Sequence, residues 1–469
     1  MKLLIMQLQG LALQDGIQVA YGLVGIVVVA LLVANLSKRP NLDAIPTVGC
    51  STWLGSWWAS IKCLAKVADI IQEGYEKHKG SPFKVAGLYR WTVVVSGSQF
   101  VEEVRKASDD ELSFMDAAND SLNLEYTLGH DVHHNPFHVA IIRCQLTRNL
   151  GNFYPDLRDE IVTAFEETLD LPGNGEPYFV VITVRHRLMY EGHRMEERSR
   201  IPNRPEGHMQ GDSSSAGRNP DWIDLAMGFT LDVIKGGVMI GLFPKVLAPL
   251  VARFMTNVPG SARRGMKLLG PIIEERQKHL EEYGKDWVDK PNDFLSWLMD
   301  HPEASESSIK DLTLRILSVN FAAIHTSSNL FTQALYIMAA NPQYMQPLRE
   351  EVESIVEKGG WSKGALAKMR KIDSFLTECH RIEGIGCVSM TRKVMKDFTF
   401  SDGTVLPKGT LLTTASQATH LDNANYENAG RFDPFRFANM REEEGEAIKH
   451  SYASTNSEYL AFGHGKHAW

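Results

Sequence analysis

The sequence predicts a mainly α-helical protein with a small β subdomain, preceded by one N-terminal membrane-spanning helix. The membrane helix is predicted from Gly16–Leu36, a run of 21 residues in which only Gln18 and Asn35 are strongly polar. Alternating or β-branched segments, which favour strands, are concentrated in residues 83–95 and 388–414. Most of the remaining sequence has the apolar spacing of helices, so we expect helices to form the bulk of the core.

The composition restricts the class of protein. With 469 residues, the chain is long enough for one large domain or two of ordinary size. Its net charge of −8 argues against a nucleic-acid partner. The cysteines are scattered and odd in number, which is typical of a reducing compartment rather than of a disulfide framework. They are Cys50, Cys63, Cys144, Cys379 and Cys387.

Residues 1–40 are predicted to form a signal anchor whose transmembrane helix is residues 16–36. A helix of this length is about long enough to cross a bilayer. Lys38 and Arg39 follow it directly, so the positive-inside rule places the body of the protein, residues 41–469, in the cytosol. A cleaved signal peptide is the alternative, although its apolar region is usually shorter and its basic residues come first.

The segment after the anchor is expected to contain a stiff linker between Pro40 and Pro46. Trp53, Trp57 and Trp58 follow this linker and lie either at the membrane interface or half-buried in the core.

The strand-like segments begin soon afterwards. Residues 83–88 and 91–95 flank a turn at Tyr89-Arg90, which predicts a β-hairpin. Strands are expected again between Val388 and Thr414.

Residues 185–215 do not fit either pattern. Between Arg185 and His208 there are six arginines, three histidines and two prolines without helical or strand periodicity. The segment is either a solvated basic loop or a mis-spliced insertion, and we favour the insertion because a regular pattern resumes at Trp222. A structureless stretch of this length is uncommon inside a compact domain.

The longest helical pattern is Ile309–Ala340, which Asn341-Pro342 ends. Apolar residues surround this helix, so it should be buried. A polar cluster, His325-Thr326-Ser327-Ser328, lies in its middle, where unsatisfied polar groups are costly. Thr326 and Ser327 could simply donate hydrogen bonds to carbonyls one turn earlier, which is the structural alternative to a functional role.

Two later motifs combine acidic and basic residues. Glu378 and Arg381 are one turn apart on a predicted helix from about Ser362 to Ile382, a spacing that lets the two side chains meet. Arg436, in Phe432-Asp433-Pro434-Phe435-Arg436-Phe437, could join them in a charge-assisted network.

The chain ends in Phe462-Gly463-His464-Gly465-Lys466-His467-Ala468-Trp469. In Phe-x-x-Gly-x-x-x-Cys loops, the glycines let the backbone curve around a thiolate that ligates a haem iron. Phe462, Gly465 and His467 are in register with this motif, but Trp469 occupies the cysteine position. An indole has no lone pair free for iron.

The motifs occur in one order: anchor, proline hinge, central helix with small residues before a threonine, Glu-x-x-Arg, Phe-x-Pro-x-Arg-Phe and the C-terminal loop. In this order the chain resembles the cytochrome P450 family, and from Trp287 onward it is similar to the membrane-bound fungal members. The resemblance implies a mainly helical P450 fold over residues 41–469, which we expect to be incomplete at the ligand loop. It also implies haem b as cofactor, with NADPH as electron source through a separate reductase.

The resemblance further implies a single-pass monooxygenase of the endoplasmic reticulum membrane, with a role in fungal secondary metabolism. Such an enzyme inserts one oxygen atom from O₂ into a lipophilic substrate, here a terpenoid, a steroid or a polycyclic aromatic compound. Substrate contacts are expected after Leu124, in Leu225–Phe243 and in Ile385–Val388. A truncated, haem-free pseudoenzyme or membrane-bound remnant is the alternative function, because Trp469 replaces the cysteine ligand.

On the central helix, the resemblance assigns Thr326 to proton delivery during oxygen activation. Ala322 and Ala323 match the small residues that leave room for dioxygen. His325 stands where most members have an acid, and an imidazole can relay protons near neutral pH.

Elsewhere, Glu378, Arg381 and Arg436 match a structural triad that holds the region of the haem loop. Arg392 and His467 match residues that pair with haem propionates. His138 and Arg143 could serve the same purpose, although the tryptophan usual there is absent.

A metal site in the tail is the other chemical alternative. His464 and His467 are three residues apart, and His420 could approach them. A zinc site usually needs three or four ligands, and no cysteine or acidic residue has a suitable spacing, so we predict no such site.

Overall fold

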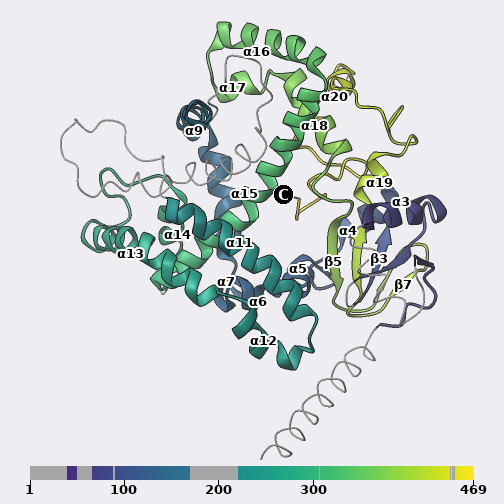
Figure 1. The fold of residues 1–469 in the computed structure, drawn as a ribbon, viewed down its shortest axis with the longest axis horizontal. Coiled ribbons are helices and arrows are strands. Elements are labelled where there is room, and N and C mark those ends of the chain that lie inside the picture. Colours follow the sequence, from purple (N-terminus) through teal and green to yellow (C-terminus); the bar gives the residue numbers. More distant parts are fainter. Residues whose placement is uncertain are drawn as a thin grey trace, which may run out of the picture.

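The computed structural model describes residues 40–49, 66–87, 90–168, 220–305, 307–443, 445 and 449–468. These residues form a mainly helical body with one six-stranded sheet and one two-stranded sheet, as predicted. In Figure 1 the six-stranded sheet lies on one side of the molecule and most helices lie on the other, with the long helix α15 (Ile309–Ala340) between them.

The six-stranded sheet brings distant parts of the chain together. Its order is β1-β2-β3-β8-β5-β4, with β3 parallel to β8 and β5 antiparallel to both of its neighbours. The strands are β1 (Thr47–Val48), β2 (Phe83–Ala86), β3 (Trp91–Val95), β4 (Leu112–Ser113), β5 (Ser389–Val394) and β8 (Leu411–Thr414). The two-stranded sheet pairs β6 (Phe398–Thr399) with β7 (Val405–Leu406).

Both strand predictions are confirmed. The hairpin pairs β2 with β3 in antiparallel register, Phe83 opposite Val94, although β2 ends at Ala86. The strands β5 to β8 all lie within the predicted range 388–414. Alternate residues of β5 are buried, so Arg392 points to the same buried face as Met390 and Val394.

The helices that precede α15 contribute to several apolar clusters. They are α3 (Val67–Lys77), α4 (Ser98–Lys106), α5 (Phe114–Leu122), α6 (Leu124–Thr127), α7 (His130–His134), α8 (Phe137–Ile141), α9 (Thr147–Thr168), α11 (Pro220–Gly241), α12 (Ala248–Met255), α13 (Val258–Tyr283) and α14 (Phe294–Asp300). A π-helical turn, Ile142–Leu146, joins α8 to α9. The largest apolar cluster contains Phe229 of α11, Ile273 of α13 and Leu317 of α15, so α15 is packed as its sequence predicts.

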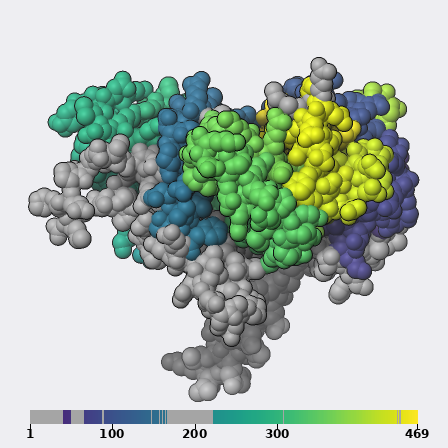
Figure 2. All heavy atoms as spheres, turned by 90° about the horizontal axis from the view of Figure 1, so that it is seen from above, coloured from purple at the N-terminus to yellow at the C-terminus, as the bar shows by residue number. Residues whose placement is uncertain are grey.

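The remaining helices follow α15. They are α16 (Met345–Gly359), α17 (Lys363–Leu366), α18 (Arg370–Ile382), α19 (Ser416–His420) and α20 (Arg436–Met440). Seen from above, the green part of the chain that includes α16 lies between the blue α9 and the yellow C-terminal segment (Figure 2). Arg158 of α9 lies 5.1 Å from the centre of the Trp361 ring, which agrees with this arrangement.

Local signals explain the bounds of α15. The Ser308 hydroxyl accepts a hydrogen bond from the Asp311 amide and caps the N-terminus, and Asn341 ends the helix before Pro342. The predicted bounds are therefore confirmed.

The predicted helix from Ser362 to Ile382 is wrong in one respect, because the structure divides it into α17 and α18. Ser362 caps α17, whereas the amides of Lys371 and Ile372 donate to the carboxylate of Glu351 on α16. A carboxylate from another helix thus caps α18 and lets it begin anew.

Three predictions lie outside the described residues: the anchor helix 16–36, the tryptophan cluster 53–58 and the unusual segment 185–215. Among the helices that the structure describes, none is both long enough and apolar enough to cross a bilayer.

Candidate functional site

A buried carboxylate network brings the three predicted triad residues together. Both oxygens of Glu378 accept from Arg381, with Nε and Nη2 each at 2.7 Å, and Arg436 Nε lies 3.2 Å from Oε1. The Asp433 amide donates to the same oxygen at 3.0 Å. Glu378 and Arg381 are completely buried. Two guanidinium groups and one amide therefore satisfy a carboxylate that would otherwise be costly to bury.

The arginines of this network also bind backbone carbonyls from other segments. Arg381 Nη1 donates to the carbonyl of His420 at 2.6 Å, and both arginines donate to the carbonyl of Arg431. Arg436 also donates to the carbonyl of Glu427. The network thus fixes α18 against α19 and the segment that leads to α20.

His420 continues this network to the C-terminal loop, residues 460–468. Its Nε2 accepts a hydrogen bond from the Leu460 amide at 2.8 Å, and its ring stacks on Tyr459. Burial, reinforced by Arg381, lowers the pKa of His420 to about 3, so the ring is neutral and can accept this bond. The sequence analysis missed this positioning residue, because a single histidine 40 residues before its partner gives no local signal.

The C-terminal loop itself is shaped by packing and by two glycines. The Phe462 ring packs edge-on against His380 and Tyr452. Gly463 and Gly465 have φ values of 74° and 84°, which side chains other than glycine rarely adopt. A Cβ at Gly465 would also clash with the side chain of Arg105. These contacts explain why the loop has phenylalanine and glycine at positions 462 and 465.

Two basic side chains, Arg392 and His467, both lie close to the ring of Phe114. The Arg392 guanidinium carbon is 5.7 Å from the centre of that ring, and the His467 ring centre is 5.4 Å from it. His467 Nε2 is 2.8 Å from Oδ1 of Asp109, which also pairs with Lys466 at 3.1 Å. Burial lowers the pKa of His467, and the hydrogen bond that His467 donates to Asp109 opposes this effect. The structure therefore places the two predicted propionate-binding residues together.

Of these two side chains, Arg392 has fewer polar partners for its donors. It is only 4% exposed, and burial lowers its pKa to about 10. Among the described residues its one hydrogen bond is from Nη1 to the Thr391 carbonyl, and no carboxylate forms an ion pair with it. A buried guanidinium with free donors is suited to bind an anion such as a carboxylate.

His138 and Arg143 do not extend this basic group in the predicted way. Nδ1 of His138 lies 3.1 Å from Arg315 Nη1, and burial together with Arg315 lowers the pKa of His138 to about 4. His138 is therefore neutral and packs in the core. Arg143 is exposed and donates to the backbone carbonyl of Lys466 in the C-terminal loop.

The histidines considered for a zinc site in the tail do not gather into one. His464 lies between Glu102 and Thr455, at 3.2 Å and 3.1 Å, while His467 pairs with Asp109. Nε2 of His420 accepts the hydrogen bond of the Leu460 amide. In the described part of the chain, a group of metal-ligating side chains forms elsewhere, at Glu125, His130 and His134.

The middle of α15 carries the remaining predicted site residues. The Thr326 hydroxyl donates to the carbonyls of Ala322 and Ala323, at 2.9 Å and 3.1 Å. The hydrogen bond to a carbonyl one turn earlier, which was the structural alternative to a functional role, is therefore present. Ala322 is exposed, and Ala323, His325 and Thr326 are half-buried, whereas Ile324 and Ser328 are buried. This side of α15 is therefore accessible at its centre, and it carries small residues beside a hydroxyl and an imidazole.

Comparison with known proteins agrees with this arrangement. The family model described as cytochrome P450 matches residues 226–468. The chain belongs to the cytochrome P450 family. Cytochrome P450 monooxygenase 151 of Postia placenta is 40% identical to it over 465 residues, which cover 97% of this chain and 88% of the relative.

Other relatives of this P450 are also fungal. Cytochrome P450 monooxygenase CYP512U6 of Ganoderma lucidum is 34% identical over 460 residues, covering 98% of this chain and 87% of the relative. Cytochrome P450 monooxygenase paxQ of Penicillium paxilli is 28% identical over 462 residues, covering 96% and 86%. The predicted fungal P450 resemblance is thus confirmed, and by family the protein is a haem-thiolate monooxygenase. The alternative of a haem-free remnant finds no support among these relatives.

The described residues of this P450 fit the carboxylates of the implied haem but do not supply a thiolate ligand for its iron. Arg392 offers a buried cation for a haem carboxylate. For the iron, position 469 holds tryptophan, and burial raises the pKa of the thiols of Cys379 and Cys387, which disfavours their thiolate forms. Neither of these two thiols is therefore suited to provide a thiolate, and the third described cysteine, Cys144, is exposed. The roles that these residues can take are binding, orientation and proton transfer.

Proposed function

We propose that this P450 oxidises a lipophilic small molecule, of the terpenoid, steroid or polycyclic aromatic class, in fungal secondary metabolism. Electrons would come from NADPH through a separate cytochrome P450 reductase. The observation that carries the proposal is Arg392, a buried guanidinium without a described carboxylate partner beside the C-terminal loop. A free buried cation is costly unless an anion completes the site, and haem supplies two carboxylates.

In this proposal Arg392 and His467 bind the haem carboxylates. Phe114, which lies against both side chains, keeps them on one side of the site. Phe462 and Gly465 give the C-terminal loop the curvature that the family needs around its ligand, and the network of Glu378, Arg381 and Arg436 holds that loop through His420.

The centre of α15 would serve proton transfer. When bound, the haem supplies the activation of dioxygen. Ala322 and Ala323 leave space beside the helix because neither side chain extends beyond Cβ. The Thr326 hydroxyl and the His325 imidazole can each accept and donate a proton. Among the described residues, the Thr326 hydroxyl bonds to carbonyls of its own helix alone.

We also propose attachment to the endoplasmic reticulum membrane by a single pass, with the catalytic body in the cytosol. The uncharged segment 16–36 and the following Lys38 and Arg39 support this topology. A glycosylation reporter fused after residue 469 tests it, since a cytosolic C-terminus stays unglycosylated and a luminal one does not.

Haem binding is the experiment that tests the proposed function. In Trp469→Cys, we expect bound haem by the pyridine assay and a thiolate signature in the reduced carbon monoxide spectrum. Adding Arg392→Ala should lower haem occupancy severalfold. Lys396→Ala is the matched control, because Lys396 is an exposed residue just after β5 that pairs with Asp110. Equal haem occupancy in the Arg392 and Lys396 variants would reject the assignment of Arg392.

Turnover tests the chemistry separately. With reductase and NADPH, Trp469→Cys should convert lipophilic probes of the three named classes to products that contain one added oxygen atom. Failure to oxidise any of them in a haem-loaded preparation would contradict the proposed substrate range.

A further inference from the structure

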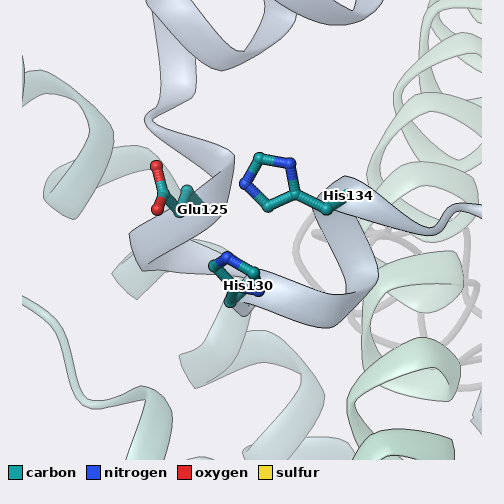
Figure 3. A group of neighbouring side chains, drawn as sticks. All are labelled: Glu125, His130 and His134. Carbon is teal, nitrogen blue, oxygen red and sulfur yellow. The ribbon is translucent and has the colours of Figure 1, made fainter.

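Three metal-ligating side chains converge at the turn between α6 and α7. The carboxylate of Glu125 and the rings of His130 and His134 have ligand atoms that all lie within 4.8 Å of one another. Figure 3 shows the rings of His130 and His134 next to each other, with the side chain of Glu125 beside them. The ring centres of the two histidines are 4.4 Å apart.

The local fold explains this convergence. His130 and His134 are four residues apart on α7, so they lie on one face of the helix. Gly129 has a φ of 120° and precedes α7, which lets the chain turn sharply after α6 and brings Glu125 back toward α7. A Cβ at Gly129 would lie 3.2 Å from Leu314 of α15, so this turn is also closely packed.

A buried arginine fixes the position of α7. Arg315 of α15 is 2% exposed, and its guanidinium donates to the carbonyls of Asp131 and Asn135, at 3.4 Å and 2.6 Å. The same guanidinium lies 3.9 Å from the centre of the Phe137 ring. Both ends of α7 are thereby attached to α15, so the two histidines are held on a rigid support.

The three side chains are available for a ligand. His130 and His134 are exposed, and Glu125 is half-buried. Neither the Glu125 carboxylate nor the His134 ring has a hydrogen-bond partner among the described residues. Nδ1 of His130 lies 3.3 Å from the Asp131 carboxylate, which leaves its Nε2 for a metal ion. A carboxylate bound to the other nitrogen commonly orients a histidine that ligates zinc.

We propose that Glu125, His130 and His134 bind one zinc ion. Two neutral imidazoles and one carboxylate are a donor set that zinc accepts, with water in the fourth position. Ligand atoms around a tetrahedral zinc ion lie about 3.4 Å apart, so small side-chain rotations would close the present separations. The bound ion would join α6 to α7 and so stabilise the turn that α15 supports.

Zinc binding to the full-length chain, prepared without a histidine tag, tests this proposal. Isothermal titration with zinc chloride should show one site per chain that His130→Asn, His134→Asn and Glu125→Gln each weaken at least tenfold. Zinc should also raise the midpoint of thermal unfolding, whereas magnesium should not, since magnesium prefers oxygen ligands. His78→Asn is the matched control, because His78 follows α3 and belongs to no described metal-ligating group.

The outcomes separate the alternatives. Unchanged zinc affinity in both His130→Asn and His134→Asn would reject the site. An equal loss in His78→Asn would show that zinc binds surface histidines generally, which also rejects it. Neither measurement requires bound haem, so this result is independent of the proposed monooxygenase function.

Discussion

The carboxylate of Glu378 bonds to groups three, 55 and 58 residues away in the chain, whereas the Thr326 hydroxyl bonds to carbonyls three and four residues away. The first set of bonds forms only when α18 has met the segment before α20. The second set forms within one helix, whatever surrounds it. The hydrogen bonds of Glu378 therefore depend on tertiary packing, whereas those of Thr326 depend only on its own helix.

This difference suggests that the Glu378 network serves stability and that the centre of α15 serves the reaction. Removing a buried group with non-local partners leaves several other groups unpaired, so the cost appears in folding. Removing a hydroxyl that bonds within its own helix leaves only carbonyls that are already bonded in the helix. We therefore expect the Glu378 network to hold the C-terminal loop, and the centre of α15 to be able to change partners during a reaction.

The largest expected effect comes from Glu378→Ala. It leaves the guanidinium of Arg381 buried without its carboxylate, which should cost about 3–5 kcal/mol in the free energy of unfolding. That is a large part of the usual stability of a domain. Denaturant unfolding followed by circular dichroism measures the change. Glu357→Ala on the exposed face of α16 is the control, and a similar loss in both variants would remove the special role of Glu378.

His420→Ala should have the next largest effect. It leaves the Leu460 amide without its acceptor in a buried position, at a cost of about 1–3 kcal/mol, with a further contribution from the lost ring. The loss should be concentrated at the C-terminal loop, so hydrogen exchange of residues 460–468 should accelerate more than that of α15. Uniform acceleration across both regions would show that His420 acts on general packing instead.

The contacts behind these two predictions differ in whether they could be predicted from the sequence. The Glu378–Arg381 pair follows from helical spacing, and Arg436 follows from a motif, so the network could be predicted. His420 bonds through its carbonyl to Arg381 and through its ring to Leu460, and neither partner is near it in sequence. Such a contact depends on how α19 packs, which local patterns do not contain.

The same reason explains the remaining differences in the fold. The bounds of α15 were predictable because Ser308 and Asn341-Pro342 act on adjacent residues. The start of α18 was not, because Glu351 caps it from another helix. The Glu125 group has a partial local signal, the four-residue spacing of His130 and His134, but the third ligand depends on the turn at Gly129.

A further effect, which depends on pH, is expected from the buried histidines. Burial lowers the pKa of His380 to about 4, and its ordinary value is about 6.5. Between these two values the unfolded chain binds more protons than the folded chain, so stability should fall as the pH decreases from about 6.5 to 4. His138 and His420, whose pKa values are also lowered, act in the same direction.

His380→Phe should make this pH dependence less steep by up to about 1.4 kcal/mol per pH unit, because one titrating group is removed. Urea unfolding at a series of pH values gives the slope. Tyr452→Phe is the control, since it removes the hydroxyl that lies 3.1 Å from His380 Nε2 but keeps the histidine. An unchanged slope in His380→Phe would mean that other groups cause the acid sensitivity.

The smallest effect on stability is expected from Thr326→Val, which keeps the shape of the side chain and removes the hydroxyl whose hydrogen is shared between the carbonyls of Ala322 and Ala323. We expect a change below about 1 kcal/mol in the free energy of unfolding. Thr332→Val on the same helix is the matched control, because the Thr332 hydroxyl makes the same kind of bond, to the Ser328 carbonyl at 2.7 Å. Two equally small changes would agree with the comparison between the two regions.

Function should then separate these two threonines. In a haem-loaded Trp469→Cys background, Thr326→Val should lower the product formed per NADPH and raise peroxide release, while Thr332→Val should do neither, because Thr332 is buried. His325→Ala distinguishes the two roles open to the imidazole. If it transfers protons, product per NADPH falls while the unfolding midpoint is kept, whereas a packing role lowers the midpoint and leaves that ratio unchanged. Equal ratios in all three variants would show that the centre of α15 has no part in proton delivery, even though the network around Glu378 still holds the loop.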